Sequence, residues 1–225
     1  MSNKVALLFK ALTKALAGFV LVAILLFVPA GTLDYVYGIR FMLILFVPML
    51  IMGIVMWFKS PELLSRRLES KEKRQAQQGV IKYSGLLFIV GFVVAGLDFR
   101  WEWSSLPHWL TQCSSVLFVA GYLLYFEVMR ENVWLSRTIR VENEQEVITT
   151  GVYGIVRHPM YTATLFMFLS IPFVLGSWWA VPIFMVYIPI IVCRILDEEK
   201  LLKTELIGYA DYCTKLRWRL IPFVW

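Results

Sequence analysis

The sequence has few of the residues that build disulfide frameworks or metal sites. Its 225 residues include three cysteines and two histidines, and the cysteines are odd in number and never form a CxxC pair. Two of the cysteines fall in apolar or membrane-edge stretches, where small side chains of this kind usually serve packing. We therefore expect Cys113, Cys193 and Cys213 to be free core residues, and we expect no metal site.

Polar residues are also scarce. Hydrophobic residues make up 59% of the chain and its mean hydropathy is +0.68, whereas ordinary globular domains are roughly 45–50% apolar. The apolar residues gather in long runs at 15–33, 41–58, 81–97 and 110–126. Each run approaches the roughly 20 residues that a helix needs to cross a bilayer. The composition excludes a soluble domain and predicts an all-α, polytopic membrane helix bundle with about four spans.

Positive charge is nearly absent from one set of loops. If the loops alternate across the membrane, 20 of the 22 Lys and Arg residues fall on one side, leaving only Arg40 and Arg100 on the other. Cytoplasmic loops carry the excess of Lys and Arg, so both termini are expected in the cytoplasm. The net charge of +6 then reflects this bias rather than a nucleic-acid partner. We expect a multi-pass protein of a bacterial or archaeal inner membrane, with no cleavable signal. The basic segment 59–79 is expected to be a solvated helix facing membrane lipid head groups.

The last two apolar stretches are short and interrupted. Residues 160–175 and 178–195 are separated only by Gly176 and Ser177. The first of them would rise about 24 Å, less than the ~30 Å hydrocarbon core. Three prolines interrupt them: Pro172, Pro182 and Pro189. We therefore expect a kinked C-terminal helical hairpin that starts and ends at the cytoplasmic face.

The motif RHPMY, residues 157–161, stands where a polar loop meets the first stretch of this hairpin. A residue before proline is pushed out of the helical region, so His158 should be extended and Pro159 should open the helix. A helix N-terminus favours negative charge, and Arg157 adds to this. An anionic group such as a carboxylate or phosphate could bind here. Alternatively, Arg157 reaches lipid phosphates and His158 only caps the helix.

An acidic cluster at 197–199 interrupts the basic trend of the C-terminal tail. Arg194 and Glu198 are four residues apart, so a surface ion pair is one interpretation. However, Arg194 lies at the end of an apolar run, where an ionisable residue indicates function. Acidic side chains near the bilayer surface could hold a cation, including a sulfonium. Together with RHPMY, this cluster predicts a cytoplasmic pocket with an anion-binding end and a cation-binding end.

Three motifs carry a family resemblance. The sequences TTGVYGIVRHPMYTA, LDEEKLL and YADYCTKLRWRLIP resemble the isoprenylcysteine carboxyl methyltransferase and phospholipid methyltransferase family of integral membrane enzymes. The resemblance covers roughly residues 125–225, with Val152 in place of a usual proline and Ala163 in place of a usual glycine. It implies N-terminal transmembrane helices at 1–129 and a methyltransferase cofactor-binding region at 130–225.

The resemblance implies transfer of a methyl group from S-adenosylmethionine to an amphiphilic, lipid-like acceptor that enters from the bilayer, above all the carboxylate of an isoprenylated cysteine. It implies two catalytic residues, Arg194 turned towards the acceptor and Glu198 contacting the cofactor. The implied cofactor-binding residues are Gln145, Glu146, Val147, Ile148, Tyr153, His158, Pro159, Met160, Tyr161 and Glu198. The cofactor's carboxylate suits the His158 end, and its sulfonium suits acidic and aromatic side chains.

Three competing hypotheses stand beside this one. A carboxylate acceptor needs no base, but a phospholipid amine would need one, with Glu198 or Glu199 as candidates. The chain could instead be an NADPH-dependent enzyme like the sterol reductases, which share an RHPxY-like turn, or a non-enzymatic membrane protein of the NnrU kind. Binding of S-adenosylmethionine or its demethylated product by the purified protein would distinguish a methyltransferase from the reductase and from the non-enzymatic protein.

Overall fold

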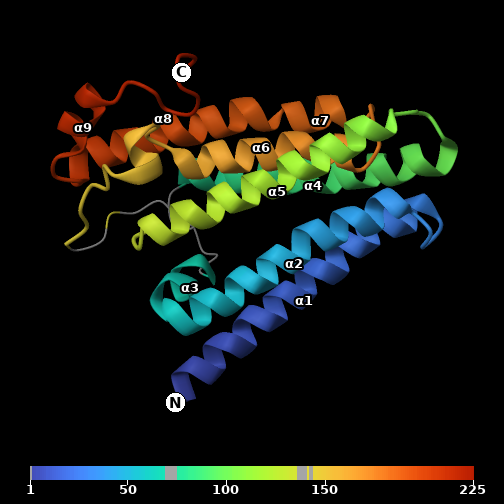
Figure 1. The fold of residues 1–225 in the computed structure, drawn as a ribbon, viewed down its shortest axis with the longest axis horizontal. Coiled ribbons are helices and arrows are strands. Elements are labelled where there is room, and N and C mark those ends of the chain that lie inside the picture. The colour runs from blue at the N-terminus through green and yellow to red at the C-terminus, as the bar shows by residue number, and fades with distance from the viewer. Residues whose placement is uncertain (1, 69–74, 136–140, 142–143) are drawn as a thin grey trace.

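The structure is a computed structural model, and it describes residues 2–68, 75–135, 141 and 144–225. Four long helices dominate these residues and run along the length of the molecule (Figure 1). They are α1 (Ser2–Ala30), α2 (Val36–Lys59), α4 (Gln75–Trp101) and α5 (His108–Glu131). No strand occurs in the described parts of the chain, so the prediction of an all-α fold is confirmed.

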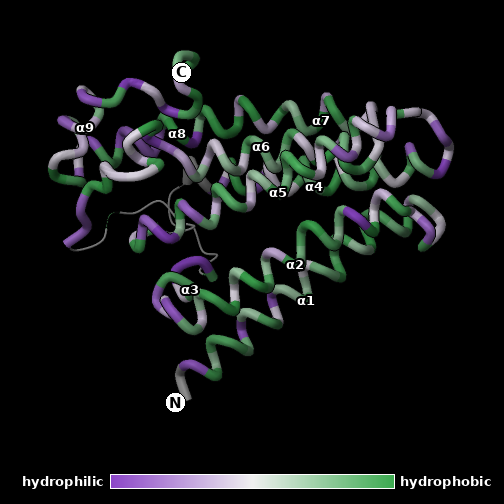
Figure 2. The backbone as a smooth tube through the Cα atoms, viewed as in Figure 1, coloured by the Kyte–Doolittle hydropathy of each residue, from purple (hydrophilic) through white to green (hydrophobic). Residues whose placement is uncertain are grey.

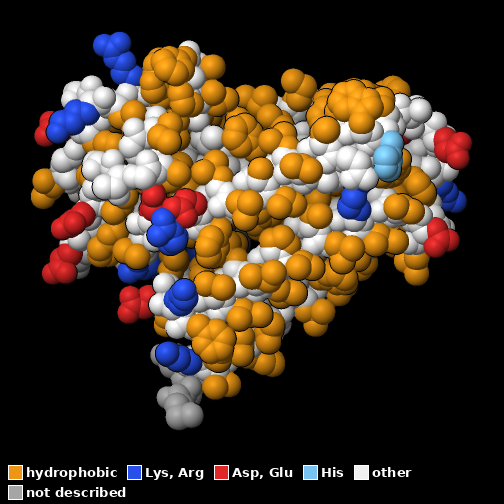
Figure 3. All heavy atoms as spheres, in the orientation of Figure 1, with side chains coloured by type: hydrophobic (Ala, Val, Ile, Leu, Met, Phe, Trp, Pro, Cys, Tyr) orange, Lys and Arg blue, Asp and Glu red, His pale blue; other side chains and the backbone are white. Residues whose placement is uncertain are grey.

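All four helices are long and apolar enough to cross a membrane. Many of their apolar side chains point outward, including Phe9 on α1 and Val116 on α5, which are 73% and 70% exposed. Apolar surface of this extent is unfavourable in water but not in hydrocarbon. Figure 2 shows hydrophobic residues along the middle of the helices, and Figure 3 shows charged side chains mainly towards the two ends of the visible face. The chain is an integral membrane protein with four candidate spans.

Glycines allow two pairs of helices to approach closely. On α4, a Cβ at Gly96 would lie 2.5 Å from the Leu26 carbonyl oxygen of α1. On α5, a Cβ at Gly121 would lie 2.6 Å from Met167 Cγ and 3.1 Å from the Ala163 carbonyl oxygen. Helices in membranes associate largely through such close backbone contacts, because hydrocarbon offers no hydrophobic driving force. Two of the helix contacts in the bundle therefore depend on glycine, which has no side chain to keep the helices apart.

The C-terminal part forms the expected kinked hairpin. Helix α6 (Pro159–Val174) leads to a turn at Gly176, whose φ of 74° favours glycine. The chain returns through α7 (Val181–Met185) and α8 (Tyr187–Glu205), which are separated at Val186. Figure 1 shows α6 and the α7–α8 pair lying beside α4 and α5, with the hairpin starting and ending at one end of the bundle.

That end of the bundle also carries the shorter elements. These are α3 (Pro61–Leu68), the 3-10 helix η1 (Gly151–Gly154) and α9 (Tyr209–Lys215). We call it the pocket end, and we call the opposite end, with residues 31–35, 102–107 and 175–180, the turn end. The prediction of one helix at 59–79 is wrong: Lys59 ends α2, residues 61–68 form α3 and residues 75–79 begin α4, while residues 69–74 lie outside the described part of the chain. The predicted boundary after residue 129 falls within the last turn of α5.

Buried polar groups hold the hairpin to α4 at the turn end. The Ser177 hydroxyl donates to the Asp98 carboxylate, and the Ser104 hydroxyl donates to the same oxygen at 2.7 Å. The Tyr35 hydroxyl donates to the Leu175 carbonyl at 2.6 Å. Asp98 is 1% exposed and Tyr35 is fully buried. Since an unpaired polar group is costly in an apolar environment, these contacts fix the turn of the hairpin in place.

The cysteines are free, as expected, but two of them are not in the core. Cys113 and Cys193 are exposed on the outside of the bundle, and Cys213 is partly buried. The prediction of core positions is therefore wrong for Cys113 and Cys193. Both the protein interior and the lipid-facing surface of a membrane helix are apolar, so an apolar run alone does not tell these two environments apart.

Candidate active site

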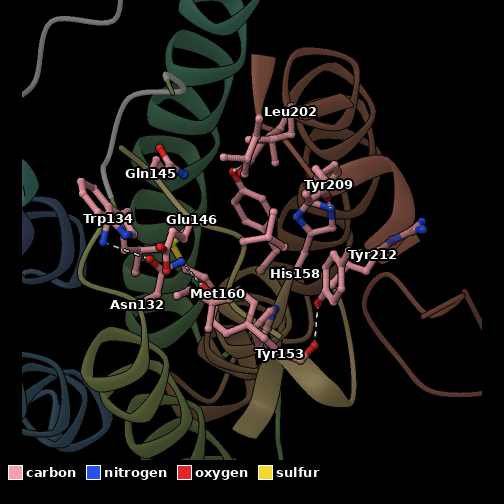
Figure 4. A pocket seen from close by; sticks show the side chains of 18 of the residues that line it. Asn132, Trp134, Gln145, Glu146, Tyr153, His158, Met160, Leu202, Tyr209 and Tyr212 are labelled. Carbon is pink, nitrogen blue, oxygen red and sulfur yellow. Dashed lines mark hydrogen bonds between the residues drawn. The ribbon is translucent and has the colours of Figure 1, made fainter. Parts of the chain in front are cut away.

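A pocket at the pocket end is built from segments that are distant in the sequence. Its walls come from the residues after α5, the loop 145–148, η1, the start of α6 and the facing parts of α8 and α9. Figure 4 shows Asn132, Trp134 and Glu146 on one side and His158, Tyr209 and Tyr212 on the other. All of the residues implied by the family resemblance line this pocket: Gln145, Glu146, Val147, Ile148, Tyr153, His158, Pro159, Met160, Tyr161, Arg194 and Glu198.

The RHPMY turn has the predicted local conformation. His158 is the N-cap of α6 with φ −124° and ψ 59°, outside the helical region, and Pro159 is the first helical residue. The backbone N–H groups of Arg157 and His158 donate to the carbonyls of Trp218 and Arg219, each at 2.9 Å. These bonds satisfy backbone donors ahead of the helix. The C-terminal segment thus holds the turn that feeds side chains into the pocket.

The side chain of Arg157 points into the protein rather than to lipid. It is 5% exposed, and its guanidinium lies 2.8 Å from a Glu199 carboxylate oxygen. It also donates to the carbonyls of Cys213 and Leu216, at 3.4 and 3.3 Å. The interpretation in which Arg157 reaches lipid phosphates is therefore wrong. Its charge is matched inside the protein, because a buried guanidinium requires a partner.

Glu199 is the centre of a buried ion cluster. Its carboxylate is 3% exposed and accepts contacts from Arg157 at 2.8 Å, Arg219 at 3.1 Å, His158 at 3.3 Å and Lys203 at 3.8 Å. Burial raises the pKa of the Glu199 carboxyl, but the hydrogen bond from His158 and the surrounding positive charges outweigh this and lower the pKa to about 2. Glu199 is therefore a paired anion at neutral pH, and it is not among the side chains that line the pocket. Its candidacy as a general base is wrong, because so weak a base takes up protons poorly.

Tyr161 joins the two residues predicted to be catalytic. Its hydroxyl donates to Glu198 Oε2 at 2.5 Å and accepts from Arg194 Nε at 2.9 Å. The Arg194 guanidinium also lies 5.9 Å from the centre of the Tyr161 ring. The spacing of four residues places Arg194 and Glu198 on one face of α8, as the sequence indicated. The phenol of α6 thus connects a carboxylate and a guanidinium of α8 at the pocket wall.

Several lining residues were missed by the sequence analysis, among them Asn132, Trp134, Tyr209 and Tyr212. The Asn132 amide donates to the Tyr153 hydroxyl at 2.9 Å, and the Tyr212 hydroxyl donates to the Tyr153 carbonyl at 2.5 Å. The spacing of Tyr209 and Tyr212, three residues apart in a helix, could have indicated a common face. Asn132 and Trp134 gave no such signal, because they lie at the pocket through contacts with segments that are distant in the sequence.

The phenols around the pocket stay protonated at neutral pH. Burial raises the pKa of the Tyr212 hydroxyl to about 12, and it raises the pKa of Tyr153 and Tyr209 further above their ordinary value. These groups therefore act as neutral hydrogen-bond donors. Together with the Glu198 carboxylate and the amides of Asn132 and Gln145, they make a pocket that can bind a cationic, hydrogen-bonding ligand with apolar parts.

Comparisons with known proteins give one family match and one similar fold. Residues 110–206 match the model of the phospholipid methyltransferase family. The fold is similar to that of a eukaryotic intramembrane Ras methyltransferase, isoprenylcysteine carboxyl methyltransferase, with a TM-score of 0.50 and 15% sequence identity. This similarity covers 99% of the present chain and 86% of the other. No curated protein sequence matches the chain. The predicted resemblance is therefore confirmed: residues 110–206 carry the sequence pattern of the phospholipid methyltransferase family, within a membrane fold like that of isoprenylcysteine carboxyl methyltransferase.

Proposed function

We propose that the chain transfers a methyl group from S-adenosylmethionine to an amphiphilic acceptor that reaches the pocket from the bilayer. The observation that carries this proposal is the convergence of the implied site residues on one pocket. They come from the loop 145–148, the RHPMY turn and α8, and all lie within the family-matched region. The family match also favours a methyltransferase over an NADPH-dependent reductase or a non-enzymatic membrane protein.

The side chains in the pocket suit this cofactor. When bound, S-adenosylmethionine supplies a methyl group on a positively charged sulfur. The Glu198 carboxylate and the ring faces of Tyr153 and Tyr161 attract a cation. Asn132 and Gln145 can hydrogen-bond a ribose or a base. Apolar side chains provide a wall for an aromatic ring: Val147, Ile148, Leu202 and Leu206.

The charged residues favour a carboxylate as the acceptor. Arg194 is a cation that can hold and orient a carboxylate, while Tyr161 fixes the guanidinium from the other side. A carboxylate is already a nucleophile, so the protein needs only to align it, and alignment can supply much of the rate enhancement. Glu199, which would be a candidate base for an amine, is locked among cations. We therefore infer that the acceptor is the carboxylate of an isoprenylated cysteine or of a related amphiphile.

A phospholipid amine is the second candidate, because the matching family model is that of phospholipid methyltransferases. In this case a proton must leave the amine, and Glu198 is the base that the pocket offers. Glu198 lines the pocket, and it already accepts the Tyr161 hydrogen bond, which weakens it as a base.

Two measurements on the purified full chain in detergent test the proposal. Calorimetric titration with S-adenosylhomocysteine should show binding, and titration with NADPH should not. Transfer of labelled methyl groups should then be followed with a farnesylated cysteine and with phosphatidylethanolamine as acceptors. Labelling of the farnesylated cysteine supports a carboxylate acceptor. Labelling of phosphatidylethanolamine alone would show that the acceptor is an amine instead. Absence of S-adenosylhomocysteine binding in folded protein would overturn the proposed function.

A further inference from the structure

The N-terminal part of the chain reaches the pocket through α3. This helix lies outside residues 110–206, which match the methyltransferase family, and it stands at the pocket end of the arm formed by α1 and α2 (Figure 1). Leu63 and Leu64 are buried and hold α3 against the rest of the protein. Its last turn carries Arg66 and Arg67. Neighbouring helical residues point about 100° apart, so these two side chains reach different places.

Arg67 contacts one wall of the pocket. Its guanidinium donates to the Tyr125 hydroxyl of α5 and to the Met160 sulfur of α6, the latter at 3.8 Å. The same group lies 5.4 Å from the centre of the Tyr125 ring. Met160 lines the pocket in the first turn of α6, next to His158. Arg67 thus contacts Met160, a pocket side chain, through its N–H edge, and it also contacts Tyr125 of α5.

Arg66 contacts a second wall. It donates to the Val133 carbonyl at 2.6 Å, and its guanidinium lies 5.2 Å from the centre of the Trp134 ring. Trp134 lines the pocket opposite His158 and Tyr209, as Figure 4 shows. The short segment after α5 that carries Trp134 is therefore held by α3 as well as by the bond from Asn132 to Tyr153 of η1.

We propose that Arg66 and Arg67 are positioning residues that hold the Trp134 and Met160 walls of the pocket. Methionine has three rotatable bonds and readily adopts other rotamers when nothing fixes it. A planar guanidinium can hydrogen-bond and stack at once, which a lysine ammonium cannot do. The walls move when the arginines are lost, and ligand affinity falls. Only the identity of that ligand rests on the proposed function.

The test uses the full chain in detergent, with its methionine methyl groups labelled with carbon-13. The Met160 signal is assigned through Met160→Leu and is recorded without ligand in Arg67→Leu, Arg67→Lys and Arg66→Leu. S-Adenosylhomocysteine affinity is measured by calorimetry on the same samples. Arg130→Leu is the matched control, because Arg130 is an exposed arginine near the end of α5 that pairs with Glu127 and does not line the pocket.

We expect Arg67→Leu and Arg67→Lys to shift and narrow the Met160 signal, and Arg66→Leu to leave it in place. All three should weaken S-adenosylhomocysteine binding about three- to tenfold, which lies at the lower end of the effects of coupled neighbouring residues. In a Met160→Leu background, Arg67→Leu should cost less affinity than it does alone. An unchanged Met160 signal in Arg67→Leu, or full recovery with lysine, would overturn the inference. If Arg67→Leu shifts the Met160 signal but the wild-type protein binds no S-adenosylhomocysteine, the positioning role is supported and the proposed function is rejected.

Discussion

At the scale of single residues, Arg194 and Glu198 both bond the Tyr161 hydroxyl, but we expect different roles for them. Arg194→Met should abolish methyl transfer while leaving S-adenosylhomocysteine affinity nearly intact, because the proposed function assigns this guanidinium to the acceptor. Glu198→Gln should weaken binding of S-adenosylmethionine about tenfold or more, because the proposed function places this carboxylate beside the positively charged sulfur and an interaction with a charged group contributes roughly 1.5–3 kcal/mol. Melting temperature, calorimetric affinity and methyl transfer are measured on the same samples. If both variants keep the cofactor affinity and the activity per folded molecule of the wild-type protein, neither residue belongs to the site.

The Glu199 cluster predicts a specific pH dependence of stability. Since its folded pKa is lowered from 4.5 to about 2, the ionised carboxyl stabilises the fold above pH 4.5. This contribution, about 3 kcal/mol, is lost as the pH falls from 4.5 towards 2. Glutamine does not titrate, so the stability advantage of wild type over Glu199→Gln should shrink across this window. Denaturant unfolding of both proteins in detergent measures the difference between their free energies of unfolding. A difference that stays constant down to pH 2.5 would contradict the lowered pKa of Glu199.

The sequence was sufficient for part of the site and insufficient for another part. Proline constrains its neighbours locally, so the conformation of His158 could be predicted from RHPMY alone. Which of the two adjacent acids faces the pocket could not be predicted from their spacing, and only the family resemblance indicated Glu198. Glu198 and Glu199 differ by one step around α8, and the contacts with Arg157 and Arg219, which come from distant segments, decide which of them is neutralised.

At the scale of the helices, Gly96 tests whether α1 and α4 depend on close approach. Gly96→Ala would place a Cβ 2.5 Å from a backbone carbonyl of α1, which cannot move without shifting the helix. We expect a loss of roughly 1–3 kcal/mol, the usual cost of overpacking. Gly85→Ala on the same helix is the control, since a Cβ there meets no atom within 4 Å. The melting temperature of Gly85→Ala should stay the same or rise, and an equal fall in both variants would reject the close-contact explanation.

The helices themselves were largely predictable, because length and apolar content define a span without reference to its neighbours. The interruption between α7 and α8 followed from prolines in a short apolar stretch. The side of each helix that faces the protein could not be predicted from the sequence. Cys113 and Cys193, for example, were expected in the core but are exposed. In a bilayer both sides of a helix are apolar, so the pattern that separates core from surface in water is lost.

At the scale of the whole molecule, the Lys and Arg distribution predicts that the pocket end faces the cytoplasm. Arg40, one of the two exceptions, donates to the Val174 carbonyl beside the hairpin turn, and the other, Arg100, lies against Gly31. Both thus belong to the turn end. In a cysteine-free background, Leu33→Cys should react with a membrane-impermeant maleimide in intact cells. Lys215→Cys should react only after the membrane is opened, and the reverse pattern would invert the proposed orientation.

The bonds from Arg157 and His158 to Trp218 and Arg219 have a consequence for biosynthesis. A ribosome makes the four spans and the RHPMY turn well before it makes the segment that holds this turn. A nascent chain that stops short of residue 218 has all its long helices, yet the backbone donors ahead of α6 have no partner. Membrane insertion and completion of the pocket are therefore separate events in time, and a truncated product can be fully inserted while its pocket end is still unformed.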